Sequence, residues 1–170
     1  MTAEIACSTP SGIPLRRVIY ERLEWDELLP TSQGFDQVSI AVALDFGDNH
    51  WCILRWRVQE PFECLTTSEW VLGDPTPHTQ IVDVSQRWAH LLGAQVVSQH
   101  LSMQDTEWGP QPWSLRLDFE NDCRLVVCLG ELTAEGEPTY LPDSLLVTDS
   151  HKRAAAYRPR AAFTSAWTDG

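Results

Sequence analysis

Long apolar runs are missing from this sequence of 170 residues. No stretch approaches the ~18 consecutive apolar residues that a membrane-spanning helix needs. The first ten residues, MTAEIACSTP, contain neither a basic start nor an apolar core, so we expect no secretory signal. The sequence therefore predicts a protein that does not associate with membranes.

Cysteine is scarce, and its spacing forms no motif. The five cysteines include no C-x-x-C pair, and a structural zinc site would normally contain such close ligand pairs. Cys52 and Cys123 lie in apolar alternating stretches, where a free thiol behaves as a small hydrophobic side chain. We therefore predict free thiols and a cytoplasmic location, with neither a metal nor a cofactor.

The common catalytic motifs are also absent. The chain contains no G-x-G-x-x-G, no G-x-x-x-x-G-K-[ST], no H-E-x-x-H and no G-x-S-x-G. Asp45-Phe46-Gly47 matches a kinase tripeptide, but the chain is far too short for a kinase, so we interpret it as a turn. These absences favour a non-enzymatic protein, while a Ser-His-Asp or Cys-His arrangement built from separate loops stays open.

Positive charge is in short supply. The chain has 24 acidic and 12 basic side chains, for a net charge of −12. Such a body repels the phosphates of DNA and RNA, which argues against nucleic-acid binding and favours encounter with a basic protein. A role in solubility alone is the alternative. Because residues 151–170 instead carry four basic and one acidic side chain, we predict one β-rich domain over 1–150 and a peripheral basic segment over 151–170.

Period-two alternation is the strongest structural pattern in the chain. In residues 38–46 the even positions are large and apolar and the odd positions are small or polar. This pattern predicts a strand with one buried face. Gly47-Asp48-Asn49 then supplies turn residues, and residues 51–58 run back as the second strand of a hairpin.

A second hairpin with the same design is predicted over residues 113–129, with a turn at Asn121-Asp122. Both hairpins contain the tripeptide Leu-Asp-Phe, at residues 44–46 and 117–119. Each hairpin follows a shorter predicted strand, at residues 15–23 and 96–103. We interpret this as a weak internal repeat of two strand-plus-hairpin units.

One main helix is predicted between the two units. Asp83 can cap its start, Gly93 can end it, and a stripe of apolar residues would face the sheet, namely Val84, Trp88, Leu91 and Leu92. With a late strand at 145–147, these elements predict an α+β fold that is predominantly antiparallel β-sheet. We expect about six or seven strands, arranged as a half-open barrel or sandwich, and the helix near 83–92.

Tryptophan is abundant, with eight residues. Trp56, Trp88 and Trp113 fall on predicted buried faces, whereas others stand in loops beside acidic residues. Exposed tryptophan beside charge is typical of protein interfaces, and burial of these side chains by folded-back loops is the alternative. We therefore predict a surface for a basic partner protein. It consists of Glu21, Glu24, Asp26, Glu27, Trp70, Glu107 and Trp108.

A ligand pocket is the second hypothesis. It would contain His100, Arg116 and Glu131, and would make the protein a small-molecule-binding or hydrolytic β-fold protein with a tryptophan-lined pocket. The leading hypothesis is a non-enzymatic protein-binding module. Its small, acidic and motif-poor profile is similar in character to bacterial immunity and antitoxin proteins. Self-association into a homo-oligomer or a larger assembly stays open.

Overall fold

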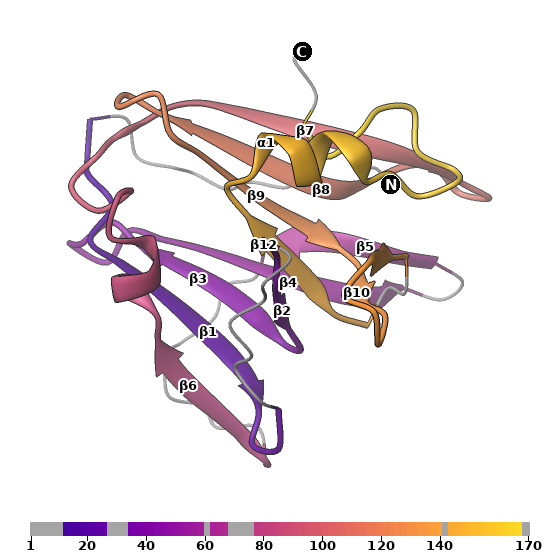
Figure 1. The fold of residues 1–170 in the computed structure, drawn as a ribbon, viewed down its shortest axis with the longest axis horizontal. Helices are drawn as coiled ribbons and strands as arrows, with labels where there is room; N and C mark the ends of the chain where they lie inside the picture. Colours follow the sequence, from indigo (N-terminus) through magenta and orange to yellow (C-terminus); the bar gives the residue numbers. More distant parts are fainter. Residues whose placement is uncertain (1–11, 27–33, 60–61, 68–76, 141–142, 168–170) are drawn as a thin grey trace.

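The structure, a computed structural model, describes residues 12–26, 34–59, 62–67, 77–140 and 143–167. In this part of the chain, ten strands form two five-stranded antiparallel sheets (Figure 1). The first sheet contains, in spatial order, β5 (Phe62–Thr67), β4 (Trp51–Gln59), β3 (Ala41–Asp45), β1 (Arg17–Leu23) and β6 (Thr79–Asp83). The second contains β2 (Asp36–Val38), β12 (Leu145–Thr148), β9 (Arg124–Leu129), β8 (Gly109–Phe119) and β7 (Val96–Thr106). A small ribbon pairs β10 (Glu131–Leu132) with β11 (Pro138–Thr139).

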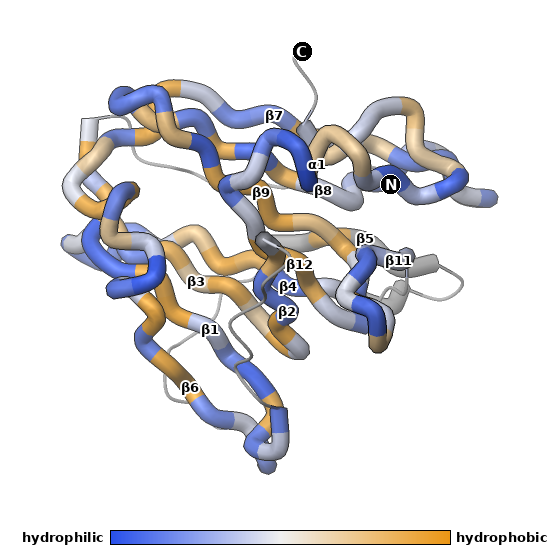
Figure 2. The backbone as a smooth tube through the Cα atoms, viewed as in Figure 1, coloured by the Kyte–Doolittle hydropathy of each residue, from blue (hydrophilic) through white to orange (hydrophobic). Residues whose placement is uncertain are grey.

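The main apolar core joins side chains of both sheets. Leu44 and Leu54 of the first sheet and Leu115 and Leu125 of the second belong to one buried cluster. The middle stretches of β3, β9 and β12 are accordingly hydrophobic in Figure 2. The predicted α+β fold, dominated by antiparallel strands, is confirmed, but the described residues contain twelve strands where about six or seven were expected.

Both predicted hairpins are present, but the first begins later than predicted. β3 pairs with β4, with Leu44 opposite Cys52, and β8 pairs with β9. Residues 38–46 do not form one strand, because Val38 ends β2 in the second sheet and Ala41 begins β3 in the first. The Ser39 carbonyl accepts a bond from the Trp56 indole at 2.8 Å, which fixes the corner between the sheets.

The first hairpin buries both of its faces, although the sequence predicted only one. The odd-numbered Ala41 and Ala43 pack with Ile19 and Ile53 into a second apolar cluster. These side chains are almost fully buried, so every residue of β3 is buried. Small apolar residues at the odd positions therefore formed a second packing surface.

The internal repeat has a counterpart in the topology. β1, β3 and β4 are neighbours in the first sheet, as β7, β8 and β9 are in the second. The two turns close with equivalent bonds, from Phe46 N to His50 O and from Phe119 N to Cys123 O, each 2.9 Å long. Both phenylalanines are buried in the core. We call β1-β3-β4 the first unit and β7-β8-β9 the second unit.

The predicted helix between the units is shorter and tighter than expected. A 3₁₀ helix covers Ser85–Trp88, and turns continue to Gly93, whose φ is +83°. Asp83 accepts a bond from Ser85 N at 2.9 Å, so it caps a turn and not an α-helix. The bond from Leu91 N to Trp88 O spans three residues, as in a 3₁₀ helix. The expected burial of Trp88 and Leu91 is nevertheless present.

The C-terminal segment is held against the second sheet. Helix α1 (His151–Ala156) begins after Ser150 and ends before Pro159, a residue that cannot continue a helix. Tyr157 and Ala166 belong to the main core, and Phe163 N bonds to Met103 O of β7 at 3.2 Å. Residues of this segment thus contribute side chains to the main core and bond to the second sheet.

Two further expectations concern membranes and thiols. Over the described ranges, no helix is long and apolar enough to cross a membrane. Cys123 and Cys128 are free thiols, as predicted. Cys52, however, is disulfide-bonded, so the prediction of a free thiol at that position is wrong. Sequence spacing contained no close cysteine pair that would have indicated this bond.

Candidate functional site

The predicted partner-binding residues do not form one surface. Glu24, Trp25 and Asp26 follow the end of β1, whereas Glu107 and Trp108 form the turn between β7 and β8. These two ends lie far apart in the fold (Figure 1). Two other predicted residues, Glu27 and Trp70, lie outside the described residues.

The end of β1 carries an exposed aromatic group, which we call the Trp25 tip and define as Glu24, Trp25, Asp26 and His78. The Trp25 side chain is 66% exposed, and its ring centroid lies 6.0 Å from that of His78. Glu24 N donates to His78 O at 2.9 Å, and the Glu24 carboxylate lies 3.8 Å from His78 Nδ1. Backbone pairing therefore fixes the base of the tip while the side chains of Glu24, Trp25 and His78 face solvent.

Two acidic residues of the predicted patch have structural roles. Glu21 is only 2% exposed and binds Arg55 Nη2 at 2.6 Å, so its predicted place on an exposed surface is wrong. The reason is strand order, because Glu21, Ala41 and Arg55 lie side by side across β1, β3 and β4. Asp26 turns inward and accepts bonds from Leu23 N and the Ser39 hydroxyl.

The turn between β7 and β8 holds the second exposed indole. Trp108 is 63% exposed, as the sequence predicted for this loop. The Thr106 hydroxyl donates to Gly109 O at 2.6 Å and accepts from Trp108 N at 3.2 Å. Gly109 has a φ of +99°, which a glycine adopts without strain. The turn is therefore ordered, yet no other aromatic ring packs on this indole in the described part of the chain.

Two of the three predicted pocket residues meet at Asp118. His100 and Arg116 lie opposite each other on β7 and β8, and their nitrogens lie 3.1 Å and 2.9 Å from Asp118 oxygens. Arg124 of β9 adds a third basic group at 3.3 Å. Glu131 does not join them, because it pairs with Thr139 in the β10-β11 ribbon.

Asp118 is the carboxylate on which the polar contacts of this cluster converge. Partial burial alone would raise its pKa, but the bond from the Ser98 hydroxyl and the charges of Arg116 and Arg124 outweigh burial and lower the pKa below its ordinary value. The carboxylate therefore remains ionised at neutral pH. Sequence reasoning missed Asp118 because its role depends on three strands meeting.

Ser98, His100 and Asp118 resemble a catalytic triad only in composition. Ser98 Oγ donates directly to Asp118 at 2.8 Å, and the same His100 nitrogen, Nε2, faces both the hydroxyl and the carboxylate. A triad needs opposite ring nitrogens for these two partners, so that one nitrogen takes the serine proton while the carboxylate orients the ring through the other. Here one nitrogen serves both contacts, and the Ser98 hydroxyl donates to the carboxylate.

Trp167 covers this cluster from the C-terminal segment. The guanidinium carbons of Arg124 and Arg116 lie 5.0 Å and 5.8 Å from the Trp167 ring centroid, and the His151 ring lies 4.8 Å away. Arg116 is consequently 3% exposed. Stacking of guanidinium groups on an indole is a favourable contact, so it helps to hold the segment in place.

A hollow of about 330 Å³ lies beside the Trp167 cover. It is lined by His90, Asp122, Cys123, Arg124, Asp149 and Trp167. His90 Nε2 lies 2.8 Å from the Asp149 carboxylate. Across the described residues, no group of three or more His, Cys, Asp or Glu side chains is placed to hold a metal ion. The hollow could hold a small polar molecule with contacts to an indole and to both charge signs.

A buried polar network connects the two sheets. Tyr20 of β1 donates to Asp36 of β2 at 2.9 Å and accepts from the Trp88 indole at 2.8 Å. Arg87 forms an ion pair with the same carboxylate. Burial raises the pKa of Asp36 although Tyr20 and Arg87 oppose the shift. Tyr20, Asp36 and Trp88 are all buried in this network, so we assign it to stability.

Comparisons with known proteins add no functional information. No known family model matches the chain, and no curated protein or solved structure is significantly similar to it.

Proposed function

We propose that this protein is a non-enzymatic binding module that docks on a basic partner protein through the Trp25 tip. The observation that carries the proposal is the indole of Trp25, which is 66% exposed beside the exposed Glu24 and His78. A tryptophan covered by a partner removes roughly 150–250 Å² from water. Tryptophan is also enriched among the few residues that dominate binding free energy.

Charge supports the choice of a basic partner. The chain carries a net charge of −12, and Glu24 presents an exposed carboxylate beside the indole. Opposite charge on a partner would accelerate encounter, and salt would weaken that effect. Trp108 lies beside Glu107 but at the other end of the molecule, so it supplies a control for general stickiness of an exposed indole.

We extend the proposal to inhibition of the partner, in the manner of bacterial immunity or antitoxin proteins, and to action in the cytoplasm. The small size, the acidic charge and the lack of catalytic motifs support this extension. The disulfide at Cys52 argues against the cytoplasmic part of this proposal, because such bonds are unusual in reducing compartments.

The test is capture of partners from native lysate with the full-length protein. Trp25→Ala and the matched Trp108→Ala would be compared with the unaltered protein, at about 50 mM and about 500 mM salt. We expect the unaltered protein and Trp108→Ala to retain one basic protein at low salt. Trp25→Ala should weaken its affinity by roughly thirtyfold or more. Equal retention by both variants, or binding indifferent to salt, would contradict the proposal.

A second candidate is binding of a small polar ligand in the hollow beside Trp167. The observation that favours it is the meeting of an indole, Arg124 and the His90–Asp149 pair around one space. A ligand there would quench or shift Trp167 fluorescence, and Arg124→Gln would remove the change. This candidate predicts normal partner capture by Arg124→Gln, which separates it from the first.

A further inference from the structure

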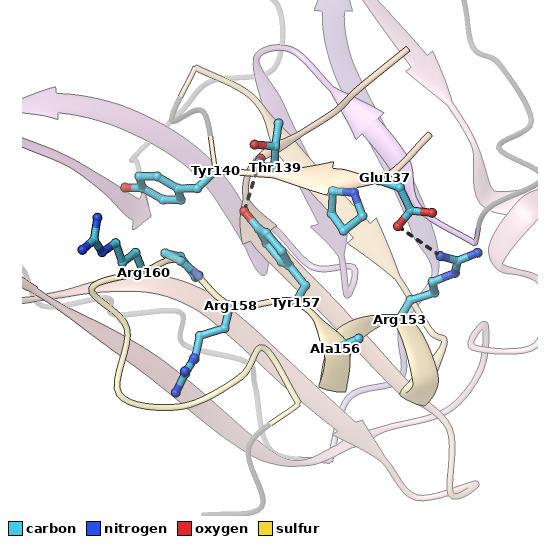
Figure 3. A pocket seen from close by; sticks show the side chains of 10 residues that line it. Glu137, Thr139, Tyr140, Arg153, Ala156, Tyr157, Arg158 and Arg160 are labelled. Carbon is cyan, nitrogen blue, oxygen red and sulfur yellow. Dashed lines mark hydrogen bonds and ion pairs between the residues drawn. The ribbon is translucent and has the colours of Figure 1, made fainter. Parts of the chain in front are cut away.

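A second hollow, of about 420 Å³, lies between the β10-β11 ribbon and the C-terminal segment (Figure 3). Tyr140 and Tyr157 contribute aromatic walls, and three arginines also line the hollow, namely Arg153, Arg158 and Arg160. The Arg158 side chain points away from Tyr157 in Figure 3. In Figure 3, Arg153 and Arg160 stand on opposite sides of Tyr157. The hollow is separate from the Trp25 tip and from the hollow beside Trp167, since it shares no lining residue with either.

The charge at this hollow opposes that of the whole molecule. Three arginines line it in a chain with a net charge of −12, and the acidic lining residue is Glu137. Glu137 Oε2 lies 3.9 Å from Arg153 Nη1, and its side chain is largely exposed, so this ion pair is weak. Among the described residues, neither Arg158 nor Arg160 has a hydrogen-bond or ion-pair partner. Three positive charges against one negative charge leave an excess of two.

The two tyrosine walls of the hollow are held in place by hydrogen bonds of their hydroxyl groups. Tyr157 Oη donates to Leu129 O at 2.6 Å, and Tyr140 Oη accepts from Gln104 Nε2 at 2.8 Å. Burial raises the pKa of Tyr157, so its ring carries a neutral hydroxyl at neutral pH. The Tyr157 ring therefore carries no charge that would oppose an anion, and the tyrosine rings and Pro159 offer apolar surface next to the arginines.

We infer that this hollow binds the phosphate group of a phosphate monoester, with the tyrosine rings against the esterified group. Its main ligands are Arg160 and Arg158, and the exposed Arg158 side chain turns toward the phosphate on binding. A phosphate monoester carries a charge of about −1.5 to −2 at neutral pH, which matches the local excess. The planar guanidinium group donates two parallel bonds to phosphate oxygens, which favours arginine over lysine in such sites.

The experiment measures binding of two probes to the full-length protein, inorganic phosphate and phenyl phosphate, by calorimetry at constant ionic strength. Phenyl phosphate should bind more tightly than inorganic phosphate, because its ring can contact the tyrosines. Arg160→Ala and Arg158→Ala should each weaken phenyl phosphate binding by roughly tenfold. Lys152→Ala removes one positive charge from the same segment without touching the hollow, and it should change the affinity less than twofold.

Several results would overturn the inference. The first is that neither probe binds. The second is that Lys152→Ala and Arg160→Ala lose equal amounts of affinity for phenyl phosphate. The third is that chloride, tested in sulfate-free buffer, binds as tightly as phosphate. Arg160→Lys keeps the charge but loses the paired donors, so full affinity in that variant would also count against it. Because Arg158 and Arg160 are exposed, the variants should fold, and unchanged circular dichroism checks this. Trp25→Ala should bind phenyl phosphate normally, so this test and the partner-capture test can fail independently.

Discussion

The first and second units share a strand order and a Leu-Asp-Phe tripeptide, yet they treat the central aspartate differently. Asp45 of the first unit binds Arg17, which is half exposed, and accepts a bond from Gly47 N of its own turn. Asp118 of the second unit contacts Ser98 and three basic side chains beneath the C-terminal segment. The same backbone ladder therefore supports a local turn contact in one sheet and a cross-strand charge cluster in the other.

The outward faces differ in the same way. In the first unit the second apolar cluster consists of small and branched side chains, including Ala43 and Ile53. In the second unit the equivalent side is polar, and the C-terminal segment bonds to it through Ser102 Oγ and Ser165 O at 2.9 Å. A polar sheet face must have its groups satisfied, and the segment supplies some of the partners. The side chains on each outward face, and not the strand order, therefore decide which segment can pack against that face.

The largest expected effect comes from removing the two aspartates in turn. Asp118→Ala should lower the free energy of unfolding by roughly 3–5 kcal/mol, because it leaves the buried Arg116 charge without its carboxylate. Asp45→Ala should cost roughly 1–2 kcal/mol, since Arg17 can turn to solvent. Urea unfolding of both variants measures the difference. Equal losses would show that the two sites are energetically alike despite their contacts.

The disulfide at Cys52 gives the next largest effect. Cys52 lies opposite Leu44 in the first unit, where the second unit has Leu125 opposite Leu117. Reduction, or Cys52→Ser, should lower the free energy of unfolding by roughly 2–4 kcal/mol. Cys123→Ser would serve as a control, because that thiol is free and only partly buried.

Alkylation of the unfolded, unreduced protein followed by mass measurement tests the same bond. We expect at most three of the five thiols to react. Reaction of all five thiols would show that the protein contains no disulfide, and this result would agree with the predicted reducing location.

The smallest effect is a difference in pH dependence. The pKa of Asp118 is lowered in the folded protein, so its charged form stabilises the fold above the unfolded pKa of about 3.9. This contribution is lost as the pH falls through the lower folded value. The stability gap between the unaltered protein and Asp118→Asn should therefore narrow between neutral and strongly acidic pH in urea titrations.

Asp36 provides the opposite sign. Its pKa is raised by burial, so its contribution to stability declines as the pH rises through the raised folded value. Relative to the unaltered protein, Asp36→Asn should become more stable as the pH rises from about 4. A gap that stays constant with pH in both variants would contradict both shifts.

The hairpins could be predicted from the sequence because their evidence is local. Alternation and turn residues fixed the second hairpin, and the same pattern placed Leu44 and Phe46 inside. The corner at Ser39 could not be predicted, since Val38 continues the alternation while joining a different sheet. Alternation indicates which side chains are buried. It does not indicate which sheet a strand joins, because both sheets bury their side chains in the same core.

The candidate sites divide along the same line. Exposure of Trp108 followed from a turn-rich loop, whereas burial of Glu21 depends on Arg55 standing two strands away. His100 and Arg116 were predicted together but without Asp118, because only the register of β7 and β8 brings them to that carboxylate. Trp25 lies beside His78 for a similar reason, the pairing of β1 with β6.

The corner at Ser39 ties the halves of the chain to one another. β2 comes from the N-terminal half but lies in the second sheet beside β12. A fragment that begins after β6 would leave β12 with a bare edge, and a fragment that ends there would carry β2 with nothing to pair. Splitting the gene between the two units should therefore yield two insoluble pieces that recover only when produced together.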